Sequence, residues 1–505
     1  MSNAAHELWV HADERPVALA VRDAERSWTY EDVRCRSAGF GDRLRSAGIA
    51  PGDRVLLVLP TTPEFVFAYY GILAHGAVAV TVNPLCPQPE LSYFVEDAGC
   101  SLVVAWHETS DAAQAAAAGA GIDCWRVGPE DFEGRSLVAT PAPALRREDD
   151  EPAVLLYTSG TTGRPKGAIL THGNITASAR SFCDTFALDA AERLGTALPL
   201  FHVFGQIAVL ATAFQAGCSL SLLRPFSGLG LLQQTAAHRI TILSGVPTMW
   251  IEMLHAVTDA KSRDLPDLKF VRSGGASLPA EVAREFEDCF GATILDGYGL
   301  SETTAAGTSC APGRPLKHGS AGQALQGVRV TLFDESGRPV ETGEVGEVAV
   351  SGPTVMRGYW NRPDATASTM RGDWLLTGDL GRMDADGYLW IVDRKKDLVI
   401  RGGYNVYPRE IEEVLYEHPA VREAAVVGVP DERLGEEVAA VVALRADAEL
   451  DVETLRPWLE ERLAAYKVPR LYSVVDQLPK GPTGKILKRA IDRGELSDTA
   501  RRVRR

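Results

Sequence analysis

The densest group of residues that could do chemistry is the stretch YTSGTTGRPKG at residues 157–167. It combines three glycines, four serine and threonine hydroxyls and two cations. Glycines let a backbone approach a ligand closely, hydroxyl and amide groups donate hydrogen bonds, and cations neutralise charge. This composition is typical of a loop that holds phosphate.

The spacing in this loop differs from the G-x-x-x-x-G-K-[ST] pattern of a P-loop. A P-loop opens directly into a helix, whereas AVLLY before this loop and GAILTH after it have the composition of strands. We therefore predict a strand–loop–strand hairpin. An exposed turn rich in Gly, Ser and Thr is the alternative that the loop alone leaves open.

Composition excludes several classes of function. The chain has 505 residues, a net charge of -15 and a pI near 5.3, which argues against broad binding to nucleic acid or anionic membranes. Its eight cysteines are scattered without a C-x-x-C pair, which favours reduced thiols and a cytoplasmic location. The N-terminus lacks the pattern of a signal peptide, and we expect no membrane-spanning helix.

The elements that must position these residues follow an α/β pattern. Residues 53–107 alternate strand-like and helix-like segments in a βαβαβ rhythm, which recurs in 268–298 and predicts helix-covered, mostly parallel sheets. The Ala-rich segment 110–123 is expected to be a surface connection. From residue 328 short strands predict a β-rich subdomain.

After residue 393 the pattern becomes that of a compact α+β module of about a hundred residues. We therefore predict an N-terminal domain at 1–393 and a small, mobile C-terminal domain at 394–505. The hinge is placed near Lys396.

Eight motifs, taken together, resemble those of the acyl-adenylate-forming superfamily, which includes acyl-CoA synthetases, adenylation domains and firefly luciferase. They occur in the family's order, and the resemblance runs from about residue 20 to residue 490. The motifs are YTSGTTGRPKG (157–167), LPLFHVFG (198–205), DGYGLSETT (296–304), GEVAVSGPTVMRGYW (346–360), LTGD (376–379), DRKKDLVIRGGYNVYPREIE (393–412), YKVPR (466–470) and PKGPTGKILKR (479–489). The resemblance implies that the chain joins a carboxylate to the α-phosphate of ATP, expels pyrophosphate and passes the acyl group to a thiol.

The resemblance assigns an ATP site. The loop would grip the β- and γ-phosphates through Thr158, Ser159, Gly160, Thr161, Thr162, Gly163 and Lys166. Tyr298 would stack on adenine, with Asp296 and Gly297 at its edge and Gly275 and Ala276 nearby. Ser301 would bind the α-phosphate, Glu302 would hold Mg²⁺, and Asp379 with Arg394 would bind the ribose.

The resemblance also assigns the acyl and thiol sites. Lys485 is expected to be the catalytic lysine, bridging the carboxylate and the α-phosphate. His202 would position the carboxylate, in an acyl pocket formed by His202, Val203, Phe204, Gln206, Gly274 and Gly299. After adenylation the C-terminal domain would rotate about Lys396 and form a CoA tunnel with Arg401, Gly402, Gly403 and Tyr404.

Phe-His at 201–202 replaces the Asp usual in amino-acid-activating relatives, so a hydrophobic fatty or aryl acid fits better. CoA is the expected acceptor, because no carrier domain is fused and residues 360–393 lack an obvious insertion. The alternative is an acyl-AMP ligase that loads a carrier protein. The oligomeric state, monomer or homodimer, stays open.

Overall fold

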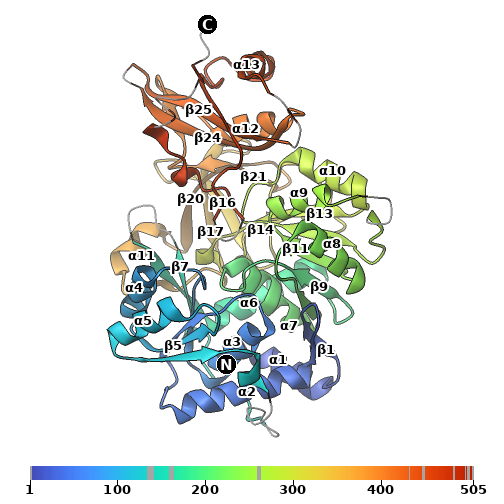
Figure 1. The fold of residues 1–505 in the computed structure, drawn as a ribbon. Coiled ribbons are helices and arrows are strands. Elements are labelled where there is room, and N and C mark those ends of the chain that lie inside the picture. Colours follow the sequence, from blue (N-terminus) through green and yellow to red (C-terminus); the bar gives the residue numbers. More distant parts are fainter. Residues whose placement is uncertain are drawn as a thin grey trace.

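The computed structural model describes residues 3–133, 141–158, 164–258, 263–431, 433–445, 448, 450–481, 484–494, 496 and 501–502. A large body, blue to yellow in Figure 1, carries a smaller orange and red body that contains the last hundred or so residues. Both bodies contribute residues to a cavity that lies between them.

A seven-stranded sheet confirms the predicted βαβαβ unit. Its order is β18-β8-β7-β4-β3-β5-β6, and β7, β4, β3, β5 and β6 are parallel. Helix α3, which ends at Gly76 in a left-handed conformation (φ 84°), is buried along its whole length. The elements are β3 (Arg54–Val58), α3 (Pro63–His75), β4 (Val78–Thr81), α4 (Gln88–Ala98), β5 (Cys100–Trp106), β6 (Asp123–Val127), β7 (Pro152–Thr158), β8 (Lys166–Thr171) and β18 (Gly358–Tyr359).

The surface connection predicted for residues 110–123 is wrong. This segment forms α5 (Asp111–Ala120) and the start of β6. Ala113, Ala116 and Ala117 are buried in the apolar cluster that α4 also joins. Their i, i+3, i+4 spacing puts a stripe of small side chains on one helix face, so the helix can pack closely.

A nine-stranded sheet forms the second layer, in the order β15-β14-β13-β12-β11-β9-β10-β1-β2. The six strands from β13 to β1 are parallel, so their carboxyl ends share one edge, where α/β sheets bind ligands. The strands are β1 (Leu19–Arg22), β2 (Ser27–Thr29), β9 (Arg193–Thr196), β10 (Ser219–Leu222), β11 (Ile242–Gly245), β12 (Phe270–Ser273), β13 (Thr293–Tyr298), β14 (Thr308–Ser309) and β15 (Gln323–Ala324).

Helices pack on these sheets and join their strands. A π-helix, η3 (Phe204–Ala211), runs into α7 and is almost wholly buried. The helices are α1 (His6–Glu14), α2 (Tyr30–Ser46), α6 (His172–Phe186), α7 (Thr212–Ala216), α8 (Gly228–Ala237), α9 (Pro247–His255) and α10 (Ala280–Phe290). In the described part of the chain, no helix is both long and apolar enough to cross a bilayer.

The short strands predicted after residue 328 form an antiparallel sheet. Its members are β16 (Arg329–Phe333), β17 (Val345–Ser351), β19 (Met370–Arg371), β20 (Trp374–Met383) and β21 (Leu389–Arg394), with α11 (Pro363–Thr369) beside them. Asp379 on β20 and Arg394 on β21 are direct cross-strand partners. The register of this sheet therefore brings the two together.

The C-terminal part has apolar clusters of its own, built from residues 399–496. Its mixed sheet and helices comprise β22 (Val399–Arg401), β23 (Tyr404–Val406), α12 (Pro408–Tyr416), β24 (Val421–Asp431), β25 (Gly435–Leu444), α13 (Val452–Glu460), β26 (Leu471–Val475) and β27 (Arg501–Arg502). The α/β fold, with parallel sheets in a large part and a small α+β C-terminal part, is as predicted.

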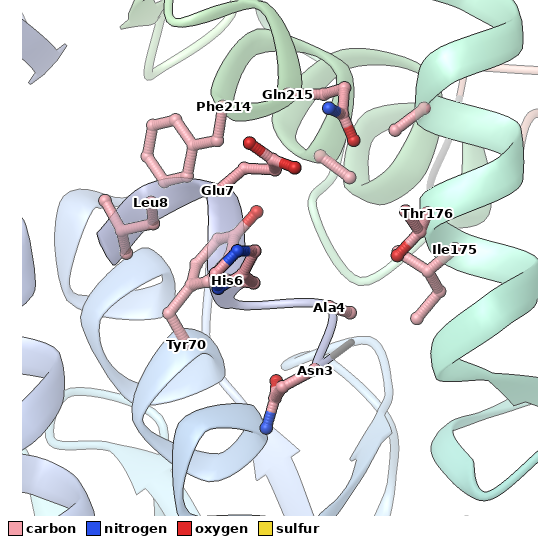
Figure 2. A pocket seen from close by; sticks show the side chains of 12 residues that line it. Asn3, Ala4, His6, Glu7, Leu8, Tyr70, Ile175, Thr176, Phe214 and Gln215 are labelled. Carbon is pink, nitrogen blue, oxygen red and sulfur yellow. The ribbon is translucent and has the colours of Figure 1, made fainter. Parts of the chain in front are cut away.

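A small pocket lies near the N-terminus, where Tyr70 and Phe214 face Ile175 and the first residues of the chain (Figure 2). Its volume is about 20 Å³, which is room for one water molecule. It is too small for a substrate.

Candidate active site

A large cavity lies between the two bodies and has a volume of about 480 Å³, within the range of small-molecule sites. Residues of the N-terminal part line one side of it, at the carboxyl ends of β11 and β13. The C-terminal part lines the other side, through Lys396, Arg409, Glu412, Glu413, Gly484, Lys485 and Lys488.

Three predicted nucleotide residues meet in one network inside this cavity. The Tyr298 hydroxyl donates to Oδ2 of Asp379 at 2.7 Å, and Nε of Arg394 lies 3.2 Å from Oδ1 of the same carboxylate. Burial raises the pKa of Tyr298 well above its usual value, so its hydroxyl keeps its proton. Asp379 is thus a buried, fixed acceptor with a cation beside it.

Asp296 lines the same cavity and is unusual in its electrostatics. Burial raises the pKa of its carboxyl to about 7, although the field of Arg409 opposes that shift. Its Oδ1 atom is sealed from solvent and has no hydrogen-bond partner in the described part of the chain. Gly275, also in the cavity wall, has φ 75°, a conformation that favours glycine, and Ala276 follows it there.

The predicted hairpin is present, since β7 and β8 are antiparallel and Thr158 pairs with Lys166. Ser159, Gly160, Thr161, Thr162 and Gly163 lie outside the described residues. After them, the guanidinium of Arg164 lies over the Tyr93 ring at 5.4 Å, and the Tyr93 hydroxyl donates to the Pro165 carbonyl at 2.7 Å. These contacts anchor the end of the loop to α4.

The hairpin base contacts Glu302, in the short helix η5 (Ser301–Thr303). Oε1 of Glu302 accepts from the Thr158 hydroxyl at 3.0 Å and from the Tyr359 hydroxyl at 2.9 Å. The ammonium of Lys166 lies 5.3 Å from the centre of the Tyr359 ring. Thr158, Lys166, Ser301 and Glu302 therefore gather beside the cavity, which Leu300 lines.

Glu302 also meets the requirement for holding Mg²⁺. No group of three or more possible metal-binding side chains occurs in the described residues. Mg²⁺ in nucleotide enzymes usually takes one or two carboxylates together with phosphate oxygens, so a single oriented carboxylate beside a cationic hairpin fits it.

Lys485 and His202 approach each other from the two bodies. Burial, together with the charge of Arg394, lowers the pKa of Lys485 to about 8. Burial and the field of Lys485 lower the pKa of His202 to about 4, so the imidazole is neutral at pH 7. Nδ1 of His202 accepts from the Phe204 amide at 3.3 Å, so the neutral ring carries its proton on Nε2.

The predicted acyl-pocket residues do not all face the cavity. His202 and Gly299 line it, and a Cβ atom on Gly274 would lie 3.3 Å from the Phe204 ring. Val203 is buried in the apolar core. The Gln206 amide is buried too, and its Nε2 donates to the Thr81 hydroxyl and the Leu200 carbonyl, both at 3.0 Å.

The predicted CoA-tunnel residues, Arg401, Gly402, Gly403 and Tyr404, do not line the cavity in this arrangement, whereas Lys396 does. Arg401 is buried in the C-terminal part, with Nε 2.7 Å from Oε1 of Glu437. Gly402 and Gly403 have φ of 58° and 86°. Tyr404 is 60% exposed, and its ring stacks on that of Tyr466 at 5.0 Å.

Sequence reasoning missed Arg409, which lies in the C-terminal part and forms hydrogen bonds with the N-terminal part. Its amide donates to Oδ2 of Asp393 at 3.0 Å, and its Nη1 donates to the Ile391 carbonyl at 2.6 Å. The only signal in the sequence was its place in the PREIE segment, where it stands on the first turn of α12.

This fold and site define an enzyme that binds a nucleotide between a large and a small domain-like body, and comparison with known families agrees. The chain matches "AMP-binding enzyme" over residues 8–360 and "AMP-binding enzyme C-terminal domain" over residues 410–485. It belongs to the AMP-binding enzyme family, and it is an AMP-forming acid–thiol ligase.

Two curated relatives are ligases of this kind. The chain is 36% identical to a long-chain-fatty-acid–CoA ligase of Bacillus subtilis, over 94% of this chain and 91% of the relative. It is 38% identical to a feruloyl-CoA synthase of an Amycolatopsis species, over 95% of this chain and 96% of the relative.

A crystal structure of ATP-bound MatB from Rhodopseudomonas palustris superposes with a TM-score of 0.91 at 32% identity, covering 98% of this chain and 99% of that one. The apo form of MatB, at 33% identity and the same coverage, gives a TM-score of 0.81. The arrangement of the two bodies in this structure is thus closer to that of the ATP-bound form.

Proposed function

We propose that this enzyme activates a carboxylic acid with an apolar body as the acyl adenylate, releases pyrophosphate and transfers the acyl group to CoA. The observation that carries the proposal is the shared cavity. Lys485 from the C-terminal part lies there close to His202, Asp379 and Arg394 of the nucleotide side. Apolar side chains such as Val246, Ile251 and Leu300 also line it, and the relatives named for long-chain fatty acids and ferulate support an apolar acid.

In the adenylation step, a carboxylate oxygen of the acid attacks the α-phosphorus of ATP and the bond to the β-phosphate oxygen breaks. The nucleophile is already ionised at pH 7, so it needs no general base. The Lys485 ammonium would lie against the oxygens that gain charge in the transition state, and its burial strengthens that interaction. The neutral His202 would donate from Nε2 and orient the acid.

The leaving pyrophosphate would be held by the hairpin, through Thr158, Lys166 and the loop between them. Glu302 would hold Mg²⁺ beside them, with its carboxylate already oriented by two hydroxyls. The ion would neutralise phosphate charge as the bond breaks. Ser301 would donate to the α-phosphate, while Asp379 and Arg394 would hold the ribose.

In the second step, the CoA thiolate attacks the acyl carbon and AMP leaves. We propose that residues 394–505 rotate about Lys396 as a C-terminal domain, which withdraws Lys485 and brings Gly402 and Gly403 to the thiol. The position of Arg401–Tyr404 outside the cavity fits an arrangement that precedes this rotation. We place the reaction in the cytoplasm, because all eight cysteines are free thiols.

The proposal is tested by measuring pyrophosphate release from ATP across a panel of acids, with and without CoA. Release accompanied by acyl-CoA supports it. Release without a CoA product would favour the alternative, transfer to the phosphopantetheine of a carrier protein. No release with any acid would refute both.

The role of Lys485 has a sharper test. Lys485→Ala should lose most of the adenylation activity, by on the order of 100-fold or more, because the charge that it places at the reacting oxygens is lost. The same variant should still convert supplied acyl adenylate and CoA to thioester. Equal losses in the two half-reactions would refute the assigned role.

A further inference from the structure

Arg272 is a buried cation that the proposed mechanism does not use. It lies on β12, is 3% exposed, and its Nη1 donates to the Ala208 carbonyl of η3 at 2.8 Å. Its guanidinium rests on the rings of Phe182 and Phe186 of α6, at 4.8 and 4.5 Å from their centres. A charge in such apolar surroundings is normally paired.

No carboxylate forms an ion pair with Arg272 in the described part of the chain. The titratable group that acts on the pKa of Arg272 is the Cys183 thiol. Burial raises the pKa of this thiol to about 12, so it is neutral at pH 7 and supplies no countercharge. Burial lowers the pKa of Arg272 to about 10, which still leaves it charged at pH 7. The guanidinium therefore lacks a neutralising partner.

Two elements connect Arg272 to the reacting end of the cavity. The chain continues from Arg272 through Ser273, the last residue of β12, and Gly274 to Gly275 in the cavity wall. On the other side, the chain runs from His202 into η3 and reaches Ala208, the acceptor of the Arg272 bond, six residues later. Arg272 does not line the cavity itself, but it bonds the helix that begins next to His202.

Phe204, the first residue of η3, contacts Gly274 and so connects these two segments. Its ring packs on the backbone of Gly274, where a Cβ atom would come within 3.3 Å of it, and the ring is only partly buried among otherwise buried neighbours. Glycine at 274 leaves room for this ring. For an acid to reach Arg272, the Phe204 ring would have to leave this position over Gly274.

We propose that Arg272 forms the far end of the acyl site and selects acids whose apolar body ends in an oxygen acceptor, such as a phenol hydroxyl or a second carboxylate. The apolar body would lie along η3 and over Gly274, with its reacting carboxylate at His202 and Lys485. The distal oxygen would accept a hydrogen bond from the guanidinium and supply the missing partner. This inference rests on the proposed function and adds the class of acid.

The test compares acids that differ only at the far end: cinnamate with 4-hydroxycinnamate, and octanoate with suberate. Pyrophosphate release gives kcat/KM for each acid. We expect the wild-type enzyme to prefer the acid with the distal oxygen in at least one pair by about 10-fold or more, since a site built to bond a substrate oxygen discriminates against its absence. Arg272→Met should reduce this ratio to near 1, and Arg272→Lys should restore part of it.

Arg36→Met is a matched control. Arg36 is also buried and lies over a phenylalanine ring, Phe67, at 5.7 Å, but it is paired with Asp32 and lies on α2. This variant should leave the ratios unchanged, and thermal unfolding of all variants reports any loss of folding.

Equal losses on both acids of a pair in Arg272→Met would show a structural role and overturn the inference. An unchanged ratio, or a wild-type enzyme that prefers the plain acid in both pairs, would also overturn it. If the wild-type enzyme releases pyrophosphate with no acid at all, the proposed function is wrong and this inference falls with it.

Discussion

At the scale of single residues, the site depends on Lys485, whose amine is costly to keep protonated because it is buried. Lys485 is buried beside Arg394, and both effects favour loss of its proton. Asp379 and Asp397 oppose them only in part. The same burial makes the charge effective once a polyanionic substrate arrives, because low dielectric strengthens electrostatic interactions.

The pKa of Lys485, about 8 instead of its usual 10.5, predicts a pH dependence. Above pH 8 the free enzyme loses the ammonium, so kcat/KM for adenylation should fall about tenfold per pH unit. Lys485→Arg should be slower but should lack this decline, because a guanidinium stays charged. The measurement is pyrophosphate release between pH 6.5 and 10. A decline that persists in Lys485→Arg would contradict the assignment.

Asp296 predicts a pH dependence of stability. Its folded-state pKa of about 7 exceeds the ordinary 3.8, so the folded protein binds more protons between these values and loses stability as the pH rises through that window. Asp296→Asn removes this loss and should be more stable than wild type at pH 8 by roughly 1 to 3 kcal/mol. Urea unfolding at pH 5 and pH 8 measures it. An identical pH dependence in both proteins would show that Asp296 is ionised without cost.

At the scale of elements, the β7–β8 hairpin and η5 orient one carboxylate. Glu302→Gln keeps an oxygen that can accept from Thr158 and Tyr359, so the fold should be unaffected. The charge for a divalent cation is lost, and adenylation should fall on the order of 100-fold with a higher Mg²⁺ requirement. Pyrophosphate release during Mg²⁺ titration checks this. Thr158→Val is the control, since it removes one hydrogen bond but no charge; the prediction is wrong if the two variants respond to Mg²⁺ alike.

Motifs and periodicity predicted the elements that follow a repeating pattern. Strands β3, β4 and β5, with α3 and α4 between them, were evident because buried strands and amphipathic helices impose opposite spacings. The Ala-rich α5 was missed although alanine is the strongest helix former, because the segment has no large apolar side chains to mark a buried face. The hairpin was predicted from its flanks.

The site was predictable where a motif contains the residue, and much less so where contacts are long-range. Asp379 and Arg394 come together through strand register, and Lys485 reaches His202 only through the packing of the two bodies. Gln206 lies in a promising motif, yet its amide bonds Thr81 far away in sequence. Arg272 could not be singled out from the sequence for the same reason, because its lack of an ion-pair partner depends on which residues surround it in the folded core.

At the scale of the whole molecule, several polar contacts between described residues join the two bodies, among them those of Arg409, Thr248 and Arg445. Arg409 donates to Ile391 and Asp393, which precede the proposed hinge. The Thr248 hydroxyl donates to the Gly484 carbonyl at 3.3 Å, close to Lys485. Arg445 lies 3.9 Å from Glu285, with both side chains substantially exposed. A two-state rotation is biased by whichever of these contacts differs in energy between the states.

Arg409 should be the contact that matters most, because its side chain bonds a backbone carbonyl at 2.6 Å and faces the buried Asp296. We expect Arg409→Ala to lower adenylation by up to about tenfold, since losing roughly 1.4 kcal/mol changes the equilibrium constant between the two arrangements by that factor. Thioester formation from supplied acyl adenylate should be unchanged or faster, because it uses the other arrangement. Arg445→Ala is the control and should alter neither step, as exposed ion pairs contribute little. Single-turnover measurements of both half-reactions decide it: parallel losses in Arg409→Ala would show that Arg409 supports folding, not the adenylation arrangement.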